Sequence, residues 1–366
     1  MKNNFLKKVF YLPNYLSLPV AGIEICNRSI KYVEFLDYKG ETSIKKFGEV
    51  PLLPNTVKDG DILNRNALVE ALKEVKKNIS TDFVKLSIPE EKNYIFDVQL
   101  PKEAKSNIRE ALEFKIEENV PLKLEESYFE YEIVNDNYSS KDMILNVSVV
   151  PKRAVADYTE VLEQVNLFPL SYEIESKMIA DSVIEKGDKR SAIILNIKDD
   201  STVLVAVIGD YVRLSSSISI GESTIIETLF KTGLFKNKLE ISKFFENDFS
   251  FETIYTKESY LSLVNIFSIF KDEVEKFNDY IMSKFFNTKL SSSGKVDRII
   301  LCGRSSSLPG LTKHINQNIN TEIILANTMS NVFDVKKHIS NMKFQDSLNF
   351  VTPIGLIVSL YRQINA

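Results

Sequence analysis

Apolar and polar positions along the chain form one arrangement that occurs twice. Residues 21–50 read as three apolar strands separated by polar turns at residues 26–28 and 38–40. Residues 192–222 repeat that arrangement, with turns at residues 198–200 and 209–210. Apolar runs bounded by short polar turns predict buried strands joined as antiparallel hairpins. We call the hairpin around residues 26–28 the first hairpin and the one around residues 198–200 the second hairpin.

The two copies align residue by residue. An offset of 172 positions places Glu24 on Asn196 and Cys26 on Lys198. A helical pattern follows each triplet, behind Asn64 and Asn66 as candidate N-caps in the first copy and behind residues 221–223 in the second. The apolar positions of these helices are Leu68, Ala71, Leu72, Val75 and Ile79, and then Ile225, Ile226, Leu229 and Phe230. Two copies of strand-strand-strand-helix predict a duplicated α/β fold with a cleft between two lobes.

A separate block lies between the copies. Residues 102–119 have the pattern of an amphipathic helix that ends before Pro121, and residues 127–134 alternate between apolar and acidic side chains. Residues 143–150 are the expected hairpin partner of that strand, and a further helix carries Val155, Tyr158, Leu162 and Val165. We interpret this block as a small α+β insert at residues 92–168.

The region after the second copy is mainly helical. An apolar stripe predicts a long helix at residues 257–286, followed by a strand at 297–302, a helix from about Pro309 and a closing helix at 346–361. The predicted division is a tail (1–19), a first lobe (20–91, 169–190 and 345–366), the insert (92–168), a second lobe (191–222 and 296–344) and a helical subdomain (223–295).

Composition excludes several functions. The chain has 12 glycines in 366 residues, where usual composition gives about 26, and none has the spacing of a dinucleotide or P-loop motif. Two histidines and two cysteines form neither a zinc motif nor a disulfide framework. The net charge is −4 with both signs interspersed, so no nucleic-acid partner is expected.

No stretch reaches the roughly 18 continuous apolar residues of a membrane span. The N-terminal tail begins with lysines and apolar residues. It has two interpretations: packing on the first strand, or a short anchor for a membrane surface or partner that uses Phe5, Leu6, Val9 and Phe10.

Six segments in order resemble the PilM family of type IV pilus assembly proteins, an actin-like group related to the cell-division protein FtsA. The segments are GIEICNRSIKYVEF (22–35), VKLSIPEEKNYIFDVQLP (84–101), NVPLKLEESYFEYEIV (119–134), residues 150–184, VDRIILCGRSSSLPGL (296–311) and FVTPIGLIVSL (350–360). The resemblance implies two RNase H-like lobes of the actin-like ATPase fold (subdomains 1A and 2A), the insert as subdomain 1C and the helical region as 2B.

The same resemblance implies an ATP-Mg²⁺ site in which the two hairpins grip the phosphates. The first hairpin then contributes Glu24 in place of aspartate, Cys26 in place of glycine, and Lys31. The polar side chains of its turn and start of the next strand are Asn27, Arg28 and Ser29.

The second hairpin contributes Asn196 in place of aspartate and Lys198 in place of glycine. On the adenosine side, Gly303 is kept, and Arg304 replaces a second glycine before Ser305. Asn196 cannot supply the negative charge that orders magnesium-bound water. We therefore expect no ATP hydrolysis and no metal-binding residues, and two outcomes stay open: nucleotide binding with little metal, or an empty cleft. A plainer alternative is that Glu24 and Asn196 only end strands in polar turns.

The resemblance implies a cytoplasmic scaffold at the inner face of the membrane. Its partner would be the N-terminal peptide of a PilN-like single-span membrane protein, held in a groove bordered by residues 92–168. Other pilus platform or motor proteins and self-association are further expected contacts.

Alternatives are an active actin-like ATPase or sugar-kinase-like enzyme, an FtsA-like membrane-associated polymer, and the actin-like domain of a type II secretion protein. Asn196 speaks against the enzymes. The chain stops soon after the closing helix, which speaks against a C-terminal anchor or span.

Overall fold

The structure is a computed structural model. It describes residues 19–38, 41–134, 142–233, 235–237, 240–241, 257–286, 296–308, 310–319, 321–332 and 341–364. The predicted N-terminal tail before Pro19, most of the turn at 38–40 and the start of a helix at Pro309 lie outside these residues.

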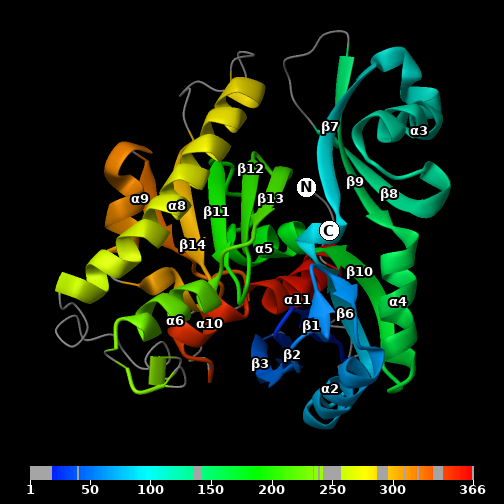
Figure 1. The fold of residues 1–366 in the computed structure, drawn as a ribbon. Helices are drawn as coiled ribbons and strands as arrows, with labels where there is room; N and C mark the ends of the chain where they lie inside the picture. Colours follow the sequence, from blue (N-terminus) through cyan, green and yellow to red (C-terminus); the bar gives the residue numbers. More distant parts are fainter. Residues whose placement is uncertain are drawn as a thin grey trace.

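The first lobe is built on a sheet with the strand order β3-β2-β1-β6-β10 (Figure 1). β1 pairs antiparallel with β2 and parallel with β6, and β6 pairs parallel with β10. Its strands are β1 (Ala21–Ile25), β2 (Ser29–Tyr38), β3 (Glu41–Pro51), β6 (Phe83–Ile88) and β10 (Phe168–Ile174). A two-stranded hairpin, β4 (Val57–Lys58) with β5 (Asp61–Ile62), follows the triplet.

The second lobe repeats this topology, with the strand order β13-β12-β11-β14-β15. The antiparallel and parallel pairings fall in the same places as in the first lobe. Its strands are β11 (Ala192–Ile197), β12 (Thr202–Ile208), β13 (Tyr211–Ile218), β14 (Arg298–Cys302) and β15 (Glu322–Leu325). The duplicated α/β fold predicted from the repeat is confirmed.

Helices cover both faces of each sheet, which explains why the strands are apolar on both sides. On the first sheet, α2 and α4 cover one face and α11 covers the other. On the second sheet, α6, α8 and α9 cover one face and α5 the other. These helices are α2 (Arg65–Asn78), α4 (Lys152–Glu163), α5 (Glu175–Val183), α6 (Glu222–Lys231), α8 (Lys257–Ile281), α9 (Leu311–Ile319) and α11 (Val351–Ile364).

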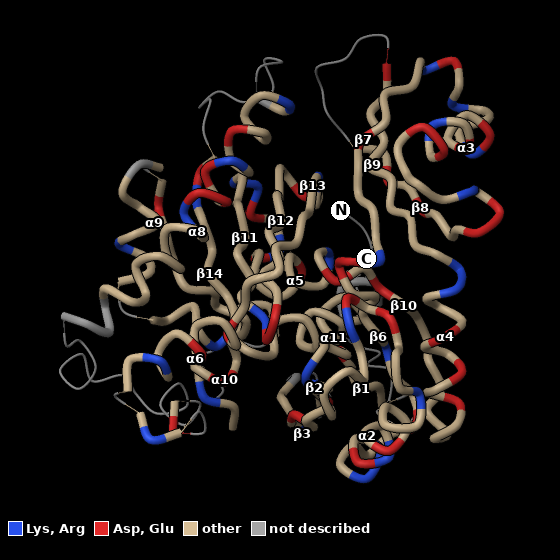
Figure 2. The backbone as a smooth tube through the Cα atoms, in the orientation of Figure 1, with Lys and Arg blue, Asp and Glu red and all other residues tan. Residues whose placement is uncertain are grey.

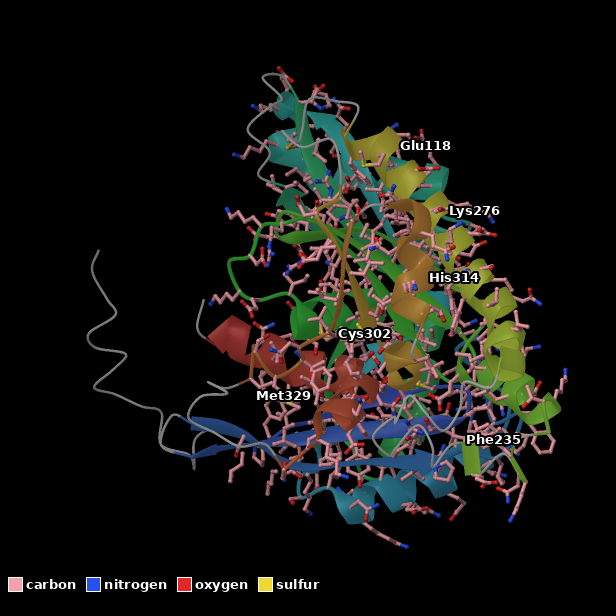
Figure 3. The ribbon with its side chains drawn as sticks, turned by 90° about the vertical axis from the view of Figure 1, so that its left-hand side faces the viewer. Glu118, Phe235, Lys276, Cys302, His314 and Met329 are labelled. Atoms are coloured by element: carbon pink, nitrogen blue, oxygen red, sulfur yellow. The ribbon has the colours of Figure 1, made fainter. Side chains whose placement is uncertain are left out.

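The first helix after the strand triplet begins where the sequence analysis expects. Asn64 caps α2, since its side chain accepts a hydrogen bond from the backbone N–H of Ala67 at 3.1 Å. The predicted long helix is α8, which continues as a π-helical turn over residues 282–286 and buries Phe267 and Val274 in the second-lobe core. Figure 3 shows His314 of α9 on the side that faces α8, where its ring packs on Phe267.

The prediction of one closing helix at residues 346–361 is wrong in one respect, because the structure has two helices there. α10 (Phe344–Asn349) ends and α11 begins on either side of Phe350. Pro353 explains the break: in one continuous helix its ring would clash with the carbonyl of Asn349, whereas near the start of a new helix its missing N–H costs nothing.

The insert has a three-stranded sheet of order β7-β9-β8, covered by α3. Its elements are β7 (Tyr94–Pro101), α3 (Ile108–Asn119), β8 (Ser127–Val134) and β9 (Asp142–Pro151). Residues 102–107, predicted as the start of the helix, form a 3₁₀ turn. The buried side chains of α4 belong to the first-lobe core. The domain boundaries stay a prediction.

The insert also contacts the second lobe, where β7 lies against β13. The guanidinium of Arg213 on β13 forms an ion pair with Asp97 on β7 at 2.5 Å. Both side chains are largely buried, so this pair fixes the insert against the second lobe.

Two helices cross between the lobes, α5 and α11. The crossing is close because Gly355 has no side chain: a Cβ built there would lie 1.9 Å from the backbone oxygen of Met178. α5 leads from the first-lobe sheet into the second, and α11 returns to pack on the first. The crossing therefore fixes how the two lobes lie against each other.

Candidate functional site

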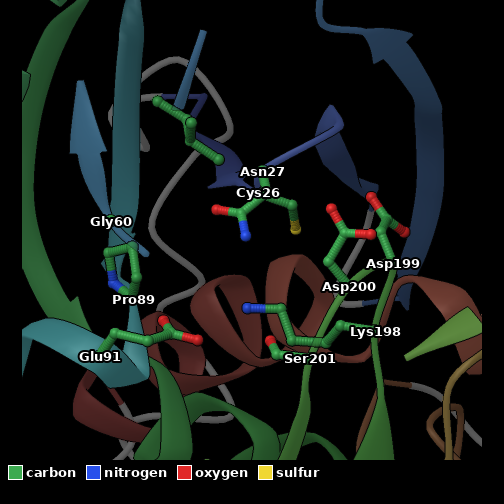
Figure 4. A pocket seen from close by; sticks show the side chains of 10 residues that line it. Cys26, Asn27, Gly60, Pro89, Glu91, Lys198, Asp199, Asp200 and Ser201 are labelled. Atoms are coloured by element: carbon green, nitrogen blue, oxygen red, sulfur yellow. The ribbon is translucent and has the colours of Figure 1, made fainter. Parts of the chain in front are cut away.

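The turns of the two hairpins face each other between the lobes (Figure 4). Each turn is closed in the same way: the Cys26 N–H donates to the Ser29 carbonyl at 2.8 Å, and the Lys198 N–H donates to the Ser201 carbonyl at 2.9 Å. The cavity that the turns leave has a volume of about 10 Å³. That is room for about one water molecule.

Asp199 joins the two hairpins. Its two carboxylate oxygens accept hydrogen bonds from the Ser29 hydroxyl at 2.9 Å and from the Lys31 ammonium at 3.3 Å. Lys31 is buried and also donates to Asn349 at 2.9 Å. Burial by itself would raise the pKa of Asp199, but Lys31 and Ser29 outweigh it and hold the pKa below its ordinary value. The pair is therefore charged at neutral pH.

Lys198 occupies the centre of the cleft. Its ammonium lies 2.5 Å from Glu175 at the start of α5 and 3.7 Å from Glu24 at the end of β1. The other oxygen of Glu175 accepts the backbone N–H of Glu90 at 2.9 Å. Burial alone would lower the pKa of Lys198, but the charge of Glu175 outweighs it and raises the pKa. One buried cation thus serves two buried carboxyl groups.

Arg28 and Asp200 form the outer pair of the turns. The Arg28 Nε lies 2.6 Å from Asp200, which also accepts the Ser223 hydroxyl at 2.6 Å. The Arg28 side chain is 60% exposed, so solvent screens the pair. It contributes less than about 1 kcal/mol.

A second set of contacts lies on the predicted adenosine side. The Arg304 guanidinium reaches Glu49 of the first lobe at 2.8 Å and Glu222 of the second at 3.6 Å. The buried Ser305 hydroxyl donates to Glu222 at 3.1 Å. Gly303 has φ +89°, and a Cβ there would lie 1.9 Å from the Ile197 carbonyl oxygen. Local packing therefore requires this glycine.

The structure brings most of the sequence-predicted residues together and separates one. Asn27 lines the cavity, and its side-chain oxygen accepts the Asp59 N–H of the β4–β5 hairpin at 3.0 Å. Asn196 is buried in β11, between Val203 and Cys302 in register.

Sequence reasoning missed several acidic partners. They are Glu49, Glu175, Asp199, Asp200 and Glu222. The sequence did contain a signal for Asp200. The repeat offset of 172, which aligns Glu24 with Asn196, also aligns Arg28 with Asp200. Arg28 and Asp200 form an ion pair across the cleft. Opposite charges at equivalent turn positions of a duplicated fold indicate that the turns meet.

Figure 2 shows Lys and Arg interspersed with Asp and Glu over both lobes. In the part of the chain that the structure describes, no helix is both long and apolar enough to cross a membrane. Over the same residues, no cluster of three or more His, Cys, Asp or Glu side chains is arranged to hold a metal ion.

Two lobes of the same topology, with two hairpins facing across a cleft, define the class of actin-like proteins. The model of the family "Type IV pilus assembly protein PilM" matches residues 22–230, more than half of the chain. The chain belongs to this family, as its sequence segments indicated.

Solved structures support the fold assignment. A structure of the PilM–PilN type IV pilus biogenesis complex has a TM-score of 0.72 at 17% identity, covering 93% of this chain and 98% of that chain. MreB 5 of Spiroplasma citri bound to AMPPNP has a TM-score of 0.56 at 11% identity, covering 95% and 98%. The ethanolamine utilization protein EutJ from Carboxydothermus hydrogenoformans has a TM-score of 0.52 at 11% identity, covering 94% and 91%. No curated protein sequence matches the chain.

Raising the pH from about 5 to about 8 is expected to destabilise the protein through Glu175. Burial raises the pKa of this carboxyl from 4.5 to about 8, and Lys198 opposes that rise without cancelling it. A group whose pKa is raised by folding stabilises the protein below its unfolded pKa, and that contribution is lost as the pH rises through the folded pKa. In Glu175→Gln the loss should be smaller by up to about 1.4 kcal/mol per pH unit. Urea unfolding of both proteins over this pH range checks the difference, and identical pH profiles would contradict it.

Proposed function

We propose that this protein is an assembly protein of a type IV pilus machine and that it works by binding partners at the inner face of the cytoplasmic membrane. The observation that carries the proposal is the family match, because residues 22–230 include both strand triplets and the whole insert. Other platform or motor proteins and further copies of the chain are additional proposed contacts.

The partner we propose is the N-terminal cytoplasmic peptide of a PilN-like membrane protein. A solved structure with the same fold is that of a PilM–PilN complex. In the insert, β8 is an edge strand and exposes Tyr128, Tyr131 and Ile133. An extended peptide adds to such an edge through backbone hydrogen bonds, while its side chains bury apolar neighbours. These features support docking along β8.

Binding of that peptide to the full chain is expected to weaken by roughly 10-fold or more in the double variant Tyr131→Ala with Ile133→Ala. Both side chains are about two-fifths exposed, so their removal takes apolar contact area from the peptide and little from the core. Isothermal titration with the synthetic peptide measures the change. Phe114→Ala is the matched control, because Phe114 is an exposed aromatic of α3 in the same insert and should leave affinity unchanged. Equal affinities for the double variant and the native chain would overturn this docking site.

For the nucleotide cleft, we propose that it does not turn over ATP. Asn196 supplies no charge for magnesium, Lys198 lies between Glu24 and Glu175, and the cavity between the turns takes about one water. The active-ATPase alternative needs a carboxylate in both hairpins, and at the aligned position the second hairpin has Asn196.

A further inference from the structure

Three donor side chains of the first hairpin bind carboxylates of the second hairpin. The Ser29 hydroxyl and the Lys31 ammonium hold opposite oxygens of Asp199, and the Arg28 guanidinium holds Asp200. A hydroxyl, an ammonium and a guanidinium gathered at one turn are the groups that bind phosphate and other oxyanions. The first hairpin therefore has the chemistry of an anion site, and its anion is part of the same chain.

Burial distinguishes this arrangement from an ordinary surface ion pair. Lys31 is 2% exposed and Asp199 is 18% exposed. The partners come from different lobes and are 168 residues apart in the chain. Breaking such a pair leaves a buried ammonium without its counter-charge, which is far more costly than losing an exposed pair.

The second hairpin also provides a cation for a carboxylate of the first hairpin. This cation is Lys198, whose ammonium lies 3.7 Å from Glu24 of the first hairpin and 2.5 Å from Glu175 of α5. Figure 4 shows the Lys198 side chain extending into the cavity while Asp199 and Asp200 lie at its side. One hairpin thus provides both a carboxylate for the donors opposite and a cation for the carboxylate opposite.

We propose that Asp199 is an internal ligand of the first hairpin, which takes the place of an oxyanion and, together with Lys198, holds the two lobes closed without a nucleotide. The proposal rests on the proposed function only in taking the cleft to work without ATP turnover. Its consequence is a latent oxyanion site formed by Ser29 and Lys31, which removal of the Asp199 carboxylate makes available to inorganic phosphate.

The test is a titration of the full chain with inorganic phosphate at constant ionic strength, comparing the native protein with Asp199→Ala. The variant should bind phosphate at least about tenfold more tightly than the native protein and should gain thermal stability from it. Adding Lys31→Met to Asp199→Ala should abolish the gain. Asp210→Ala is the control, because Asp210 is a 56% exposed carboxylate that lies 3.9 Å from Lys189 and belongs to neither hairpin, so this variant should behave like the native chain.

Asp199→Asn keeps the shape of the side chain and removes its charge, so it serves if Asp199→Ala does not fold. Equal phosphate affinities for the native chain and a folded Asp199 variant would overturn the proposal, as would a gain that survives Lys31→Met. Peptide binding measured on the same proteins separates the two proposals. A native-like peptide affinity with no phosphate gain refutes only the internal ligand, and a phosphate gain in a chain that binds no peptide refutes only the partner.

Discussion

Lys198→Met is expected to destabilise the protein by about 3–5 kcal/mol at neutral pH. The Lys198 side chain is 8% exposed, and its ammonium is the cation between Glu24 and Glu175. Methionine has a similar length but no charge, so the variant keeps most of the packing and leaves two carboxyl groups buried together. Like charges in a site of low polarity disfavour ionisation of at least one of them. The loss should therefore be smaller at acid pH than at pH 8.

Urea unfolding measures this loss, with Lys189→Met as the matched control. Lys189 is 76% exposed, and its nearest carboxylate, Asp210, is 3.9 Å away and also exposed. Its replacement should change the free energy of unfolding by no more than about 0.5 kcal/mol. If Lys198→Met lowered the free energy of unfolding by no more than the control does, the ion pairs of Lys198 with Glu24 and Glu175 would not stabilise the closed lobes.

Gly355→Ala is expected to cost about 3 kcal/mol, the upper end of the usual cost of overpacking, because it forces the two interlobe helices apart. An added Cβ would lie 1.9 Å from the Met178 backbone oxygen, and a backbone atom inside a packed helix cannot move alone. α5 carries Glu175, and α11 begins two residues after Asn349. The shift should therefore also disturb the contacts that Lys198 and Lys31 make in the cleft.

Gly48→Ala is the control for this crossing. Its Cβ would also approach too closely, at 2.3 Å, but the atoms that it meets belong to the end of the Tyr32 side chain, which can shift more easily than the backbone of a packed helix. We expect a loss near 1 kcal/mol for Gly48→Ala, and thermal unfolding of both variants checks the order. A Gly355→Ala protein as stable as the Gly48→Ala protein would show that the crossing is not a rigid constraint.

Most of the architecture could be predicted because local patterns of apolar and polar residues specify it. Two triplets of short apolar runs, each followed by a helical stripe, are enough to specify two sheets of equal topology. The break before α11 was missed because α10 has only six residues and leads into the apolar α11 across Phe350 alone, so only Pro353 marked the boundary.

The contacts of the site were harder to predict than the fold. Glu24, Ser29, Lys31 and Lys198 were found because they lie in the aligned hairpins. Glu175 begins a helix far from either hairpin in sequence, and Glu49 lies at the end of a strand. Only the closing of the two lobes brings such carboxylates to Lys198 and Arg304, and no local pattern encodes it.

The most direct test of the account is a measurement of Mg²⁺-dependent ATP turnover and ATP binding by the purified full chain, beside Glu24→Ala. The side chains of the two hairpins pair with one another across the cleft. The account therefore predicts no turnover above background and no difference between the two proteins. Turnover by the native chain that is abolished in Glu24→Ala would contradict it.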